Sequence, residues 1–306
     1  MLNAKMDKNN TEYDFKWEGN LTDEMKNSFT ENGFFIARQF LDSEEVANIW
    51  KVVEDPDGIL NHGYMTYEEN GRQIQRTLCS YPGHDVTGMV ARCEKVDGSC
   101  EQLLGCEVYH WCSMFVNKEA CVGGEIVWHQ DYGYWYNDGV LYPDMITVWM
   151  PLDKCRKDNS CIQVLRSSNK MGRVNHSKVP SGQMSADPER VNDIMKKCEH
   201  LYLEMDPGDA LFHHGNTLHR SDENKSKNGR LGFLSCFNGA HNSPVFKTGY
   251  PSYNKLEKVP NEAIKQCTNC TDFSGKGFRD RSVNNMKRKP DNQKPSAENG
   301  KKALKS

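Results

Sequence analysis

The 306-residue sequence contains no long apolar run. A membrane-spanning helix needs about eighteen or more consecutive apolar residues, and no segment of the chain approaches that length. The first twenty residues are polar and lack the apolar stretch of a signal peptide. We therefore expect a cytoplasmic protein with no membrane partner.

The chain also has no excess of basic residues. It carries 39 Lys and Arg against 42 Asp and Glu, which gives a formal net charge of -3 and an isoelectric point near 6.4. A protein that binds nucleic acid neutralises phosphates with clustered Lys and Arg, and such a surface usually gives a basic domain. We expect no nucleic-acid partner.

Paired cysteine motifs are scarce although the chain has twelve cysteines. Cys267 and Cys270 form the only Cys-x-x-Cys pair, and a four-cysteine zinc site would need a second one. The other cysteines are scattered through apolar runs in a chain with no export signal. They are expected to be reduced thiols.

The composition predicts one folded domain between two polar ends. The chain is 37% hydrophobic, enough for a single large core, whereas both ends contain few apolar residues. Segments of this kind cannot bury enough apolar surface to fold. We expect a disordered segment at 1–18, a catalytic domain at 19–273 and a disordered tail at 274–306.

Short β-prone runs separated by turn residues predict a mainly β fold, a sandwich or barrel. Residues 21–32 are expected to form a helix, and a capping box at Asp42 begins another at 46–53. A further helix, expected from Asp187 to Cys198, reads as an insertion over one end of the barrel. The expected strands are 33–37, 106–116, 124–131, 145–152, 160–165, 200–205, 210–213 and 230–238.

His129 and Asp131 stand two residues apart in an aromatic stretch. On a strand they would face the same way and could bind one ion. Two histidines and one carboxylate on one face of an octahedron are diagnostic of non-haem Fe(II) oxygenases, because this set leaves three positions open. A bidentate 2-oxo acid can fill two of them, and dioxygen the third.

The second histidine comes from later in the chain, where three stand close together. A turn at 207–209 and a strand-like run at 210–214 lead to His219. His213 and His214 are alternatives, but neighbours on a strand point to opposite faces, so at most one of them faces inward. The spacing to Arg230, together with a resemblance to a known family, favours His219 among the three.

Arg230 precedes the apolar run 231–237, which reads as a strand. An antiparallel neighbour of the histidine strand could aim the guanidinium into the same pocket. Guanidinium stays charged and binds carboxylates bidentately, which suits the distal carboxylate of 2-oxoglutarate.

In combination these motifs resemble the phytanoyl-CoA dioxygenase family of Fe(II)/2-oxoglutarate oxygenases over residues 29 to about 245. The segments that carry the resemblance are 128–132 (WHQDY), 208–215 (GDALFHHG), His219 and Arg230. The resemblance implies a double-stranded β-helix, or jelly roll, with flanking N-terminal helices and an inserted helix. The implied cofactor is Fe(II), with 2-oxoglutarate as co-substrate.

The resemblance also implies individual roles. His129, Asp131 and His219 would bind iron. Arg230 and Ser221 would bind the 2-oxoglutarate side-chain carboxylate, and Asn117 would contact the co-substrate. The family's relatives that halogenate have a small residue at the position of Asp131, so the presence of this carboxylate favours hydroxylation or a related oxidation.

Aromatic residues follow the His-x-Asp motif closely. In an extended chain Tyr132, Tyr134 and Tyr136 would lie on one side and Trp135 on the other. We expect Trp135 and Tyr134 to line the substrate site, because an aromatic wall holds apolar or cationic groups. Packing of these rings at the barrel rim is the alternative.

The leading hypothesis is an Fe(II)/2-oxoglutarate dioxygenase that hydroxylates a small metabolite and releases succinate and carbon dioxide. The alternative is a non-catalytic jelly-roll protein that binds or senses a metal or ligand. A cupin-like metal hydrolase fits less well, because it gives Arg230 no role.

Overall fold

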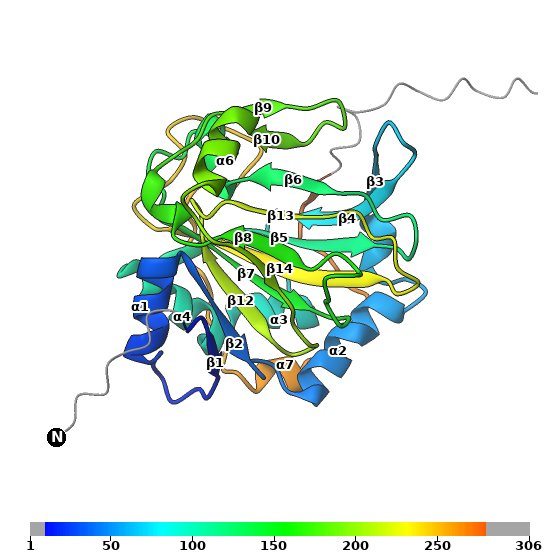
Figure 1. Ribbon diagram of the computed structural model, residues 1–306. Helices are drawn as coiled ribbons and strands as arrows, with labels where there is room; N and C mark the ends of the chain where they lie inside the picture. The colour runs from blue at the N-terminus through cyan, green and yellow to red at the C-terminus, as the bar shows by residue number, and fades with distance from the viewer. Residues whose placement is uncertain (1–9, 280–306) are drawn as a thin grey trace, which may run out of the picture.

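The computed structural model describes residues 10–279, which form two facing β-sheets with helices on the outside (Figure 1). The larger sheet has the strand order β1-β2-β12-β7-β14-β5-β4-β15, and β3 also pairs with β4. The smaller sheet has the order β11-β8-β13-β6. This architecture confirms the expected mainly β fold, and its two sheets are those of a jelly roll.

The strand boundaries follow the chain order. The larger sheet contains β1 (Glu12–Asp14), β2 (Phe34–Arg38), β3 (Tyr64–Tyr67), β4 (Gln73–Cys79), β5 (Val108–Lys118), β7 (Met145–Pro151), β12 (Ala210–His214), β14 (Arg230–Gly239) and β15 (Phe278–Arg279). The smaller sheet contains β6 (Ile126–His129), β8 (Ile162–Leu165), β11 (His200–Leu203) and β13 (His219–Ser221). A separate hairpin joins β9 (His176–Lys178) and β10 (Met184–Ala186).

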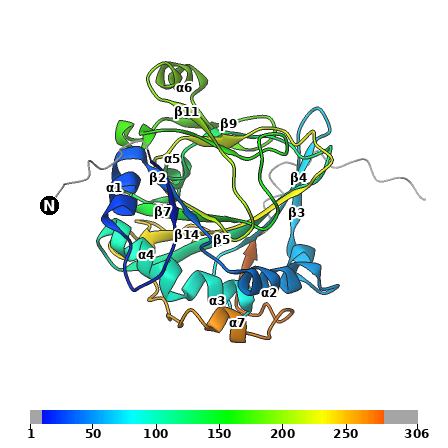
Figure 2. The ribbon, with the colours of Figure 1, turned by 60° about the horizontal axis from the view of Figure 1, so that its bottom comes forward.

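The longer helices are distributed unequally around the sheets. Figure 2 shows α2, α3, α4 and α7 along the outer face of the larger sheet, with α1 beside β2 and α6 on the opposite side of the molecule. The helices are α1 (Asp23–Asn32), α2 (Ser43–Glu54), α3 (Val86–Arg92), α4 (Glu94–Leu104), α5 (Asp131–Trp135), α6 (Pro188–Met195) and α7 (Ala263–Gln266). Short 3-10 helices are Ile59–His62, Tyr136–Asp138 and Ser168–Met171.

The main apolar core lies between the larger sheet and its covering helices. Phe35 stacks on Phe212 at 4.9 Å between ring centroids, and Phe115 meets Phe233 at 4.8 Å. Strand residues alternate between faces, so the residues next to Phe115 point to the inner face instead. The inner face is therefore free to line a cavity.

Expected strands and helices are confirmed in most places. Every strand-like run contains a strand, the capping box at Asp42 begins α2, and Asp187 caps α6. The helices α3, α4, α5 and α7, the strands β3 and β4 and the β9–β10 hairpin were not expected from the sequence. In β4 the inward position of Arg76 interrupts the apolar alternation, which removes the signal for a strand.

Both expected tail boundaries are wrong. β1 pairs with β2 in parallel, so part of the segment 1–18 belongs to the larger sheet. β15 pairs with β4, and Lys276 is only 1% exposed, so the folded region extends past 274. Polar composition concealed both contacts, because they use backbone hydrogen bonds and a buried ion pair. The remaining parts of the expected tails, 1–9 and 280–306, lie outside the described residues.

Across residues 10–279, none of the helices has the length and apolar character that crossing a membrane requires.

Replacing Lys276 by alanine should lower the free energy of unfolding by roughly 3–5 kcal/mol, the cost of leaving one charge of a buried ion pair uncompensated. The Lys276 Nζ lies 2.8 Å from Asp85 Oδ2 and donates to Thr87 Oγ1 at 2.9 Å. Urea denaturation measures the change. Alanine at the exposed Lys255 is the control, and equal stability of the two variants would contradict this account.

Candidate metal and co-substrate site

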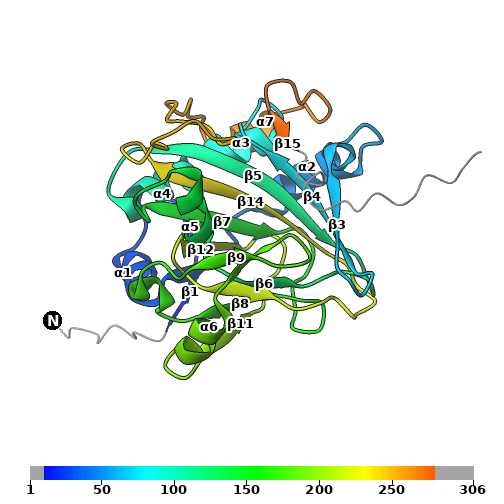
Figure 3. The same cartoon turned by 90° about the horizontal axis from the view of Figure 1, so that it is seen from above.

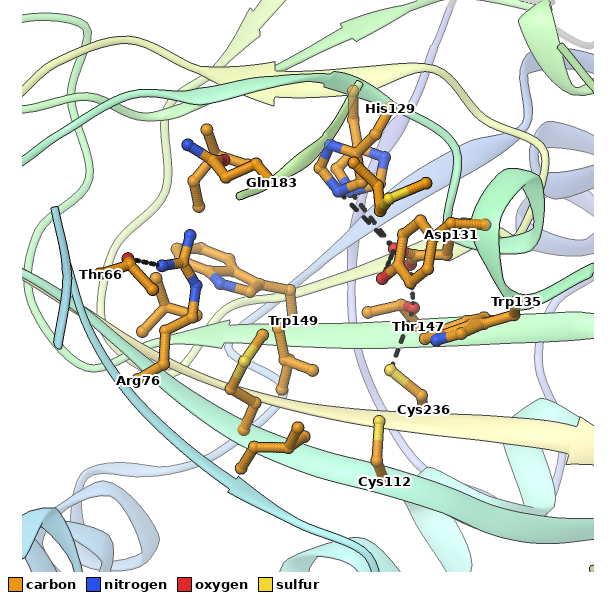
Figure 4. Close-up of a pocket in the computed structure, with 18 of the residues that line it drawn as sticks. Thr66, Arg76, Cys112, His129, Asp131, Trp135, Thr147, Trp149, Gln183 and Cys236 are labelled. Atoms are coloured by element: carbon orange, nitrogen blue, oxygen red, sulfur yellow. Dashed lines mark hydrogen bonds and ion pairs between the residues drawn. The ribbon is translucent and has the colours of Figure 1, made fainter. Parts of the chain in front are cut away.

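A cavity of about 650 Å³ opens between the two sheets, and a group of metal-ligating side chains lies on its wall (Figure 4). His129 is the last residue of β6 and His219 the first residue of β13. These two strands are antiparallel, and the register places the two histidines directly opposite each other. Their ring centroids are 4.0 Å apart.

Asp131 joins these histidines by a route different from the expected one. Asp131 is the first residue of α5 and not a strand residue. The expectation that it shares one face of a strand with His129 is therefore wrong. The chain turns from β6 into the helix and brings Asp131 Oδ1 to 3.7 Å from His129 Nε2 and 3.9 Å from His219 Nε2. One ligand atom from each of the three residues lies within 4.8 Å of the others.

Backbone carbonyls orient both imidazoles. His129 Nδ1 lies 2.8 Å from Val127 O, and His219 Nδ1 lies 3.0 Å from Thr217 O. A carbonyl only accepts, so each Nδ1 donates its hydrogen and each Nε2 keeps its lone pair toward Asp131. Burial lowers the pKa of His129 to about 3 and that of His219 to about 4. Both rings are therefore neutral near pH 7, the form that binds metals.

The Asp131 carboxylate is held by two hydroxyl groups. Thr147 Oγ1 donates to Oδ2 at 2.6 Å, and Tyr134 donates to Oδ1 at 3.2 Å. Burial raises the pKa of Asp131, but the neighbouring imidazoles of His219, His213 and His129 and the Thr147 hydrogen bond outweigh this, and the pKa falls below its usual value. The carboxylate is consequently ionised.

His213 and His214 point in opposite directions, as strand alternation requires. His213 is 2% exposed and faces the cavity, with Nε2 at 3.9 Å from Asp131 Oδ2. The His214 ring turns away, accepts the Asn216 backbone N–H and packs near Phe29. His213 is therefore a third imidazole beside Asp131, and the sequence had suggested it only as an alternative to His219.

Arg230 reaches the same cavity from the first position of β14. It is 1% exposed, and its guanidinium carbon lies 5.3 Å from the centre of the Trp149 ring. Neither Nε nor Nη1 has a hydrogen-bond partner among the described residues. A buried charged donor without an acceptor is costly, so this guanidinium fits a site for an anion.

Lys118 lies opposite Arg230 in the register of β5 and β14, and the sequence analysis missed it. Its fully buried Nζ donates to Ser221 Oγ at 2.6 Å and to Ser160 Oγ at 2.9 Å. Ser221 lines the cavity as expected, but its oxygen already accepts from this lysine. Arg230 makes this end of the cavity positive, while burial and the charge of Arg230 lower the pKa of Lys118 well below its usual value.

Asn117 does not contact the cavity, so its expected role as a co-substrate contact is wrong. Its neighbour Val116 lines the cavity, which sends Asn117 to the other face of β5. There its side-chain amide donates to Gln75 Oε1 at 3.2 Å. The alternation along β5 explains both the error and the inward position of Lys118.

Tyr134 and Trp135 both line the cavity, but the segment is helical, so the expected alternation of an extended chain is wrong. Trp135 is 2% exposed, donates to the Tyr250 hydroxyl at 3.2 Å and packs edge-on against Trp111. Tyr134 also bonds to Asp131, which places it beside the ligand group as well as in the cavity wall.

The β9–β10 hairpin covers one side of the cavity and is fastened next to the His-x-Asp motif. His176 Nε2 accepts the Gln130 backbone N–H at 2.9 Å. A Cβ at Gly133 would lie 2.0 Å from the same ring, so only glycine lets the hairpin approach α5. Gln183 of the hairpin turn then borders the cavity (Figure 4).

Comparison with known sequences gives one family and several relatives. The profile described as "Phytanoyl-CoA dioxygenase (PhyH)" matches residues 29–232. L-proline trans-4-hydroxylase of Streptomyces griseoviridis is 25% identical over 213 residues, which cover 64% of this chain and 79% of the relative. Ectoine dioxygenase of Streptomyces avermitilis is 22% identical over 233 residues, which cover 71% of this chain and 79% of the relative.

Solved structures show the same fold. EctD from S. alaskensis, crystallised with 2-oxoglutarate and 5-hydroxyectoine, superposes with a TM-score of 0.64 at 18% identity, covering 80% of this chain and 91% of that one. The carbocyclase SnoK from nogalamycin biosynthesis gives a TM-score of 0.57 at 16% identity, covering 78% and 95%. The expected double-stranded β-helix is therefore confirmed.

Replacing Thr147 by valine should weaken Zn(II) binding roughly 10- to 100-fold, the usual cost of losing a partner that orients a metal ligand. The change removes the hydroxyl bonded to Asp131 and keeps the side-chain shape. Calorimetric titration of the metal-free protein measures the affinity. Thr66→Val, at another wall of the cavity, is the matched control. Unaltered affinity in Thr147→Val would show that Asp131 needs no such support.

Proposed function

The chain belongs to the phytanoyl-CoA dioxygenase family, and from this membership and the geometry of the cavity we propose that it is an Fe(II)/2-oxoglutarate-dependent dioxygenase. We propose that it hydroxylates a small metabolite and releases succinate and carbon dioxide. The observation that carries the proposal is the convergence of His129, Asp131 and His219 in a cavity that also contains the unpartnered Arg230.

The three side chains fit an iron ion. Two neutral Nε2 atoms and one ionised carboxylate oxygen form the donor set of non-haem Fe(II) oxygenases. The Nδ1 atoms are occupied by backbone carbonyls, so neither ring needs to rotate to bind the metal. Our assignment of His129, Asp131 and His219 as the ligands rests on this preorganisation.

The positive end of the cavity fits the distal carboxylate of 2-oxoglutarate. We assign Arg230 as its main partner, because its Nε and Nη1 atoms lack acceptors among the described residues. Ser221 contributes its hydroxyl, and Lys118 holds that hydroxyl in place at 2.6 Å. The bidentate geometry of a guanidinium fixes the orientation of the carboxylate.

When bound, iron and 2-oxoglutarate supply the oxidising power that converts a C–H bond into C–OH, with dioxygen as the second co-substrate. The chain's own contribution is to orient these groups and keep water away. Thr147 and Tyr134 fix the Asp131 carboxylate, while Trp135 and Tyr250 form a dry aromatic wall.

The substrate is proposed to be small, because the relatives include enzymes named for proline and ectoine. Trp135 and Tyr134 are assigned to the wall that faces it, with Tyr134 also supporting Asp131. We further propose a single cytoplasmic catalytic domain with no nucleic-acid partner. The non-catalytic alternative finds no support, because the ligand set and Arg230 are all present.

The purified protein supplied with Fe(II), ascorbate and 2-oxoglutarate should release succinate, measured by mass spectrometry. His219→Ala should abolish Fe(II) binding and succinate release. The matched variant His213→Ala changes another buried imidazole at the same site and should keep metal affinity. If His213→Ala loses the metal and His219→Ala keeps it, the ligand assignment is incorrect. A wild-type protein that binds Fe(II) but forms no succinate would support the non-catalytic alternative.

Arg230→Ala should raise the apparent KM for 2-oxoglutarate roughly 30-fold or more, because removing one partner of a buried charge pair costs about 2–5 kcal/mol. Arg230→Lys should restore only part of the affinity, since lysine lacks the planar fork. Initial rates of succinate formation measure both. An unchanged KM in Arg230→Ala would remove this residue from the co-substrate site.

A further inference from the structure

A second buried guanidinium faces the cavity on the other side from the metal ligands. Arg76 lies on β4, is 9% exposed and extends toward Trp149 and Gln183, across the cavity from His129 and Asp131 (Figure 4). Its hydrogen bond goes to the neutral Thr66 hydroxyl, and no carboxylate pairs with it among the described residues. The family assignment and the co-substrate site leave this residue without a role.

The remaining charges of the cavity do not neutralise Arg76. Among residues 10–279, the lining contains four arginines and Lys178, but only two carboxylates, those of Asp131 and Asp138. Arg220 is paired with Asp222 at 2.7 Å and with Glu125 at 3.2 Å. Arg230 is assigned to the co-substrate. The cavity therefore keeps more positive charge than one 2-oxoglutarate carboxylate can balance.

The Glu68 carboxylate acts electrostatically on Arg76, but it is engaged elsewhere. Its charge raises the pKa of Arg76 against the larger effect of burial, but the two side chains are not within ion-pair distance. Glu68 Oε1 accepts the Glu125 backbone N–H at 2.5 Å. Arginine remains protonated even when it is buried, so Arg76 is a cation that lacks an anion.

The neighbouring strand adds a second guanidinium on the same face. Arg279 of β15 is paired with Leu78, two residues along β4 from Arg76, so all three side chains point into the cavity. Diagonal neighbours of this kind lie about 7–8 Å apart. Arg279 stacks over Tyr250 at 4.1 Å, and its Nη1 has no partner among the described residues.

The backbone makes room for this second cation. A Cβ at Gly249 would lie 2.3 Å from Arg279 Nη2, so the guanidinium occupies space that any other residue would fill. Tyr250, which supports Arg279, also bonds to Trp135. The cationic pair and the aromatic wall are therefore parts of one surface.

We propose that Arg76, assisted by Arg279, determines specificity by binding a carboxylate of the substrate, so that the substrate is a small carboxylic acid held between this pair and the metal ligands. The proposal rests on the proposed function and names its substrate class. A bidentate contact at Arg76 would fix one end of the molecule, while the wall of Trp135 and Tyr250 would contact its apolar part. The carbon to be oxidised would then face His129 and Asp131.

The test uses two probes of equal shape, benzoate and benzamide, which differ in charge. The protein is loaded with Zn(II), which replaces Fe(II), and with saturating 2-oxoglutarate, so that the co-substrate site is filled. Tryptophan fluorescence follows the binding of each probe. We expect benzoate to bind clearly more tightly than benzamide. Equal binding of the two probes, or binding of neither, overturns the proposal. Because this comparison uses the wild-type protein, it does not depend on whether a variant folds.

Arg76→Gln should weaken benzoate binding roughly 30-fold or more and leave the affinity for 2-oxoglutarate within about twofold. Arg190→Gln, at an exposed position of α6, should behave as wild type. If Arg76→Gln loses 2-oxoglutarate affinity and keeps benzoate affinity, Arg76 belongs to the co-substrate site and the proposal is rejected. A wild-type protein that forms no succinate with Fe(II) rejects the proposed function instead, whatever the probes show.

Discussion

The structure depends on placing ionisable groups inside a cavity without an ion pair for each of them. Asp131 lies among three imidazoles and accepts a hydrogen bond from the Thr147 hydroxyl, while burial keeps His129 and His219 neutral. Charge of both signs is thereby arranged before any ligand arrives. Such preorganisation is favourable for binding and costly for folding, since each buried polar group loses its hydration. The cavity can bear this cost because the apolar core lies elsewhere.

That core lies on the other side of the larger sheet. Stacked phenylalanines such as Phe35 and Phe212 join the sheet to the helices, and the inner face of the same strands adds a smaller apolar cluster that includes Leu211. Along β5, Phe115 faces the helices while Val116 and Lys118 face inward. One face of the sheet thus packs against the helices and the other lines the cavity, because successive side chains of a strand point to opposite sides. The smaller sheet then needs only to close the cavity and carry the two histidines.

The sequence was sufficient to predict the strands that are apolar on both faces. It was also sufficient to predict the metal-ligand motif, because the residue types of that motif are specific. It failed where inward positions are polar. Arg76 interrupts the apolar alternation of β4, and the expected strand 106–116 stopped short of Lys118, whose Nζ is buried against Ser221. Helix α5 was missed because aromatic residues suit strands as well as helices. No local sequence pattern predicts a buried lysine, since Ser160 and Ser221, which bind it, are distant from it in the sequence.

The positions that the sequence failed to predict are informative, because they lie at the cavity. A charged residue at an inward strand position opposes both local propensity and burial, so it is stable only where the tertiary structure provides partners or a ligand does. Lys118 has its partners in Ser221 and Ser160, so the protein itself supplies the contacts that stabilise a lysine at this inward position. Arg76 and Arg230 have no anionic partner of this kind among the described residues. Two guanidinium groups that the fold leaves without an acidic partner fit the two anions proposed for this cavity, the co-substrate and the molecule to be oxidised.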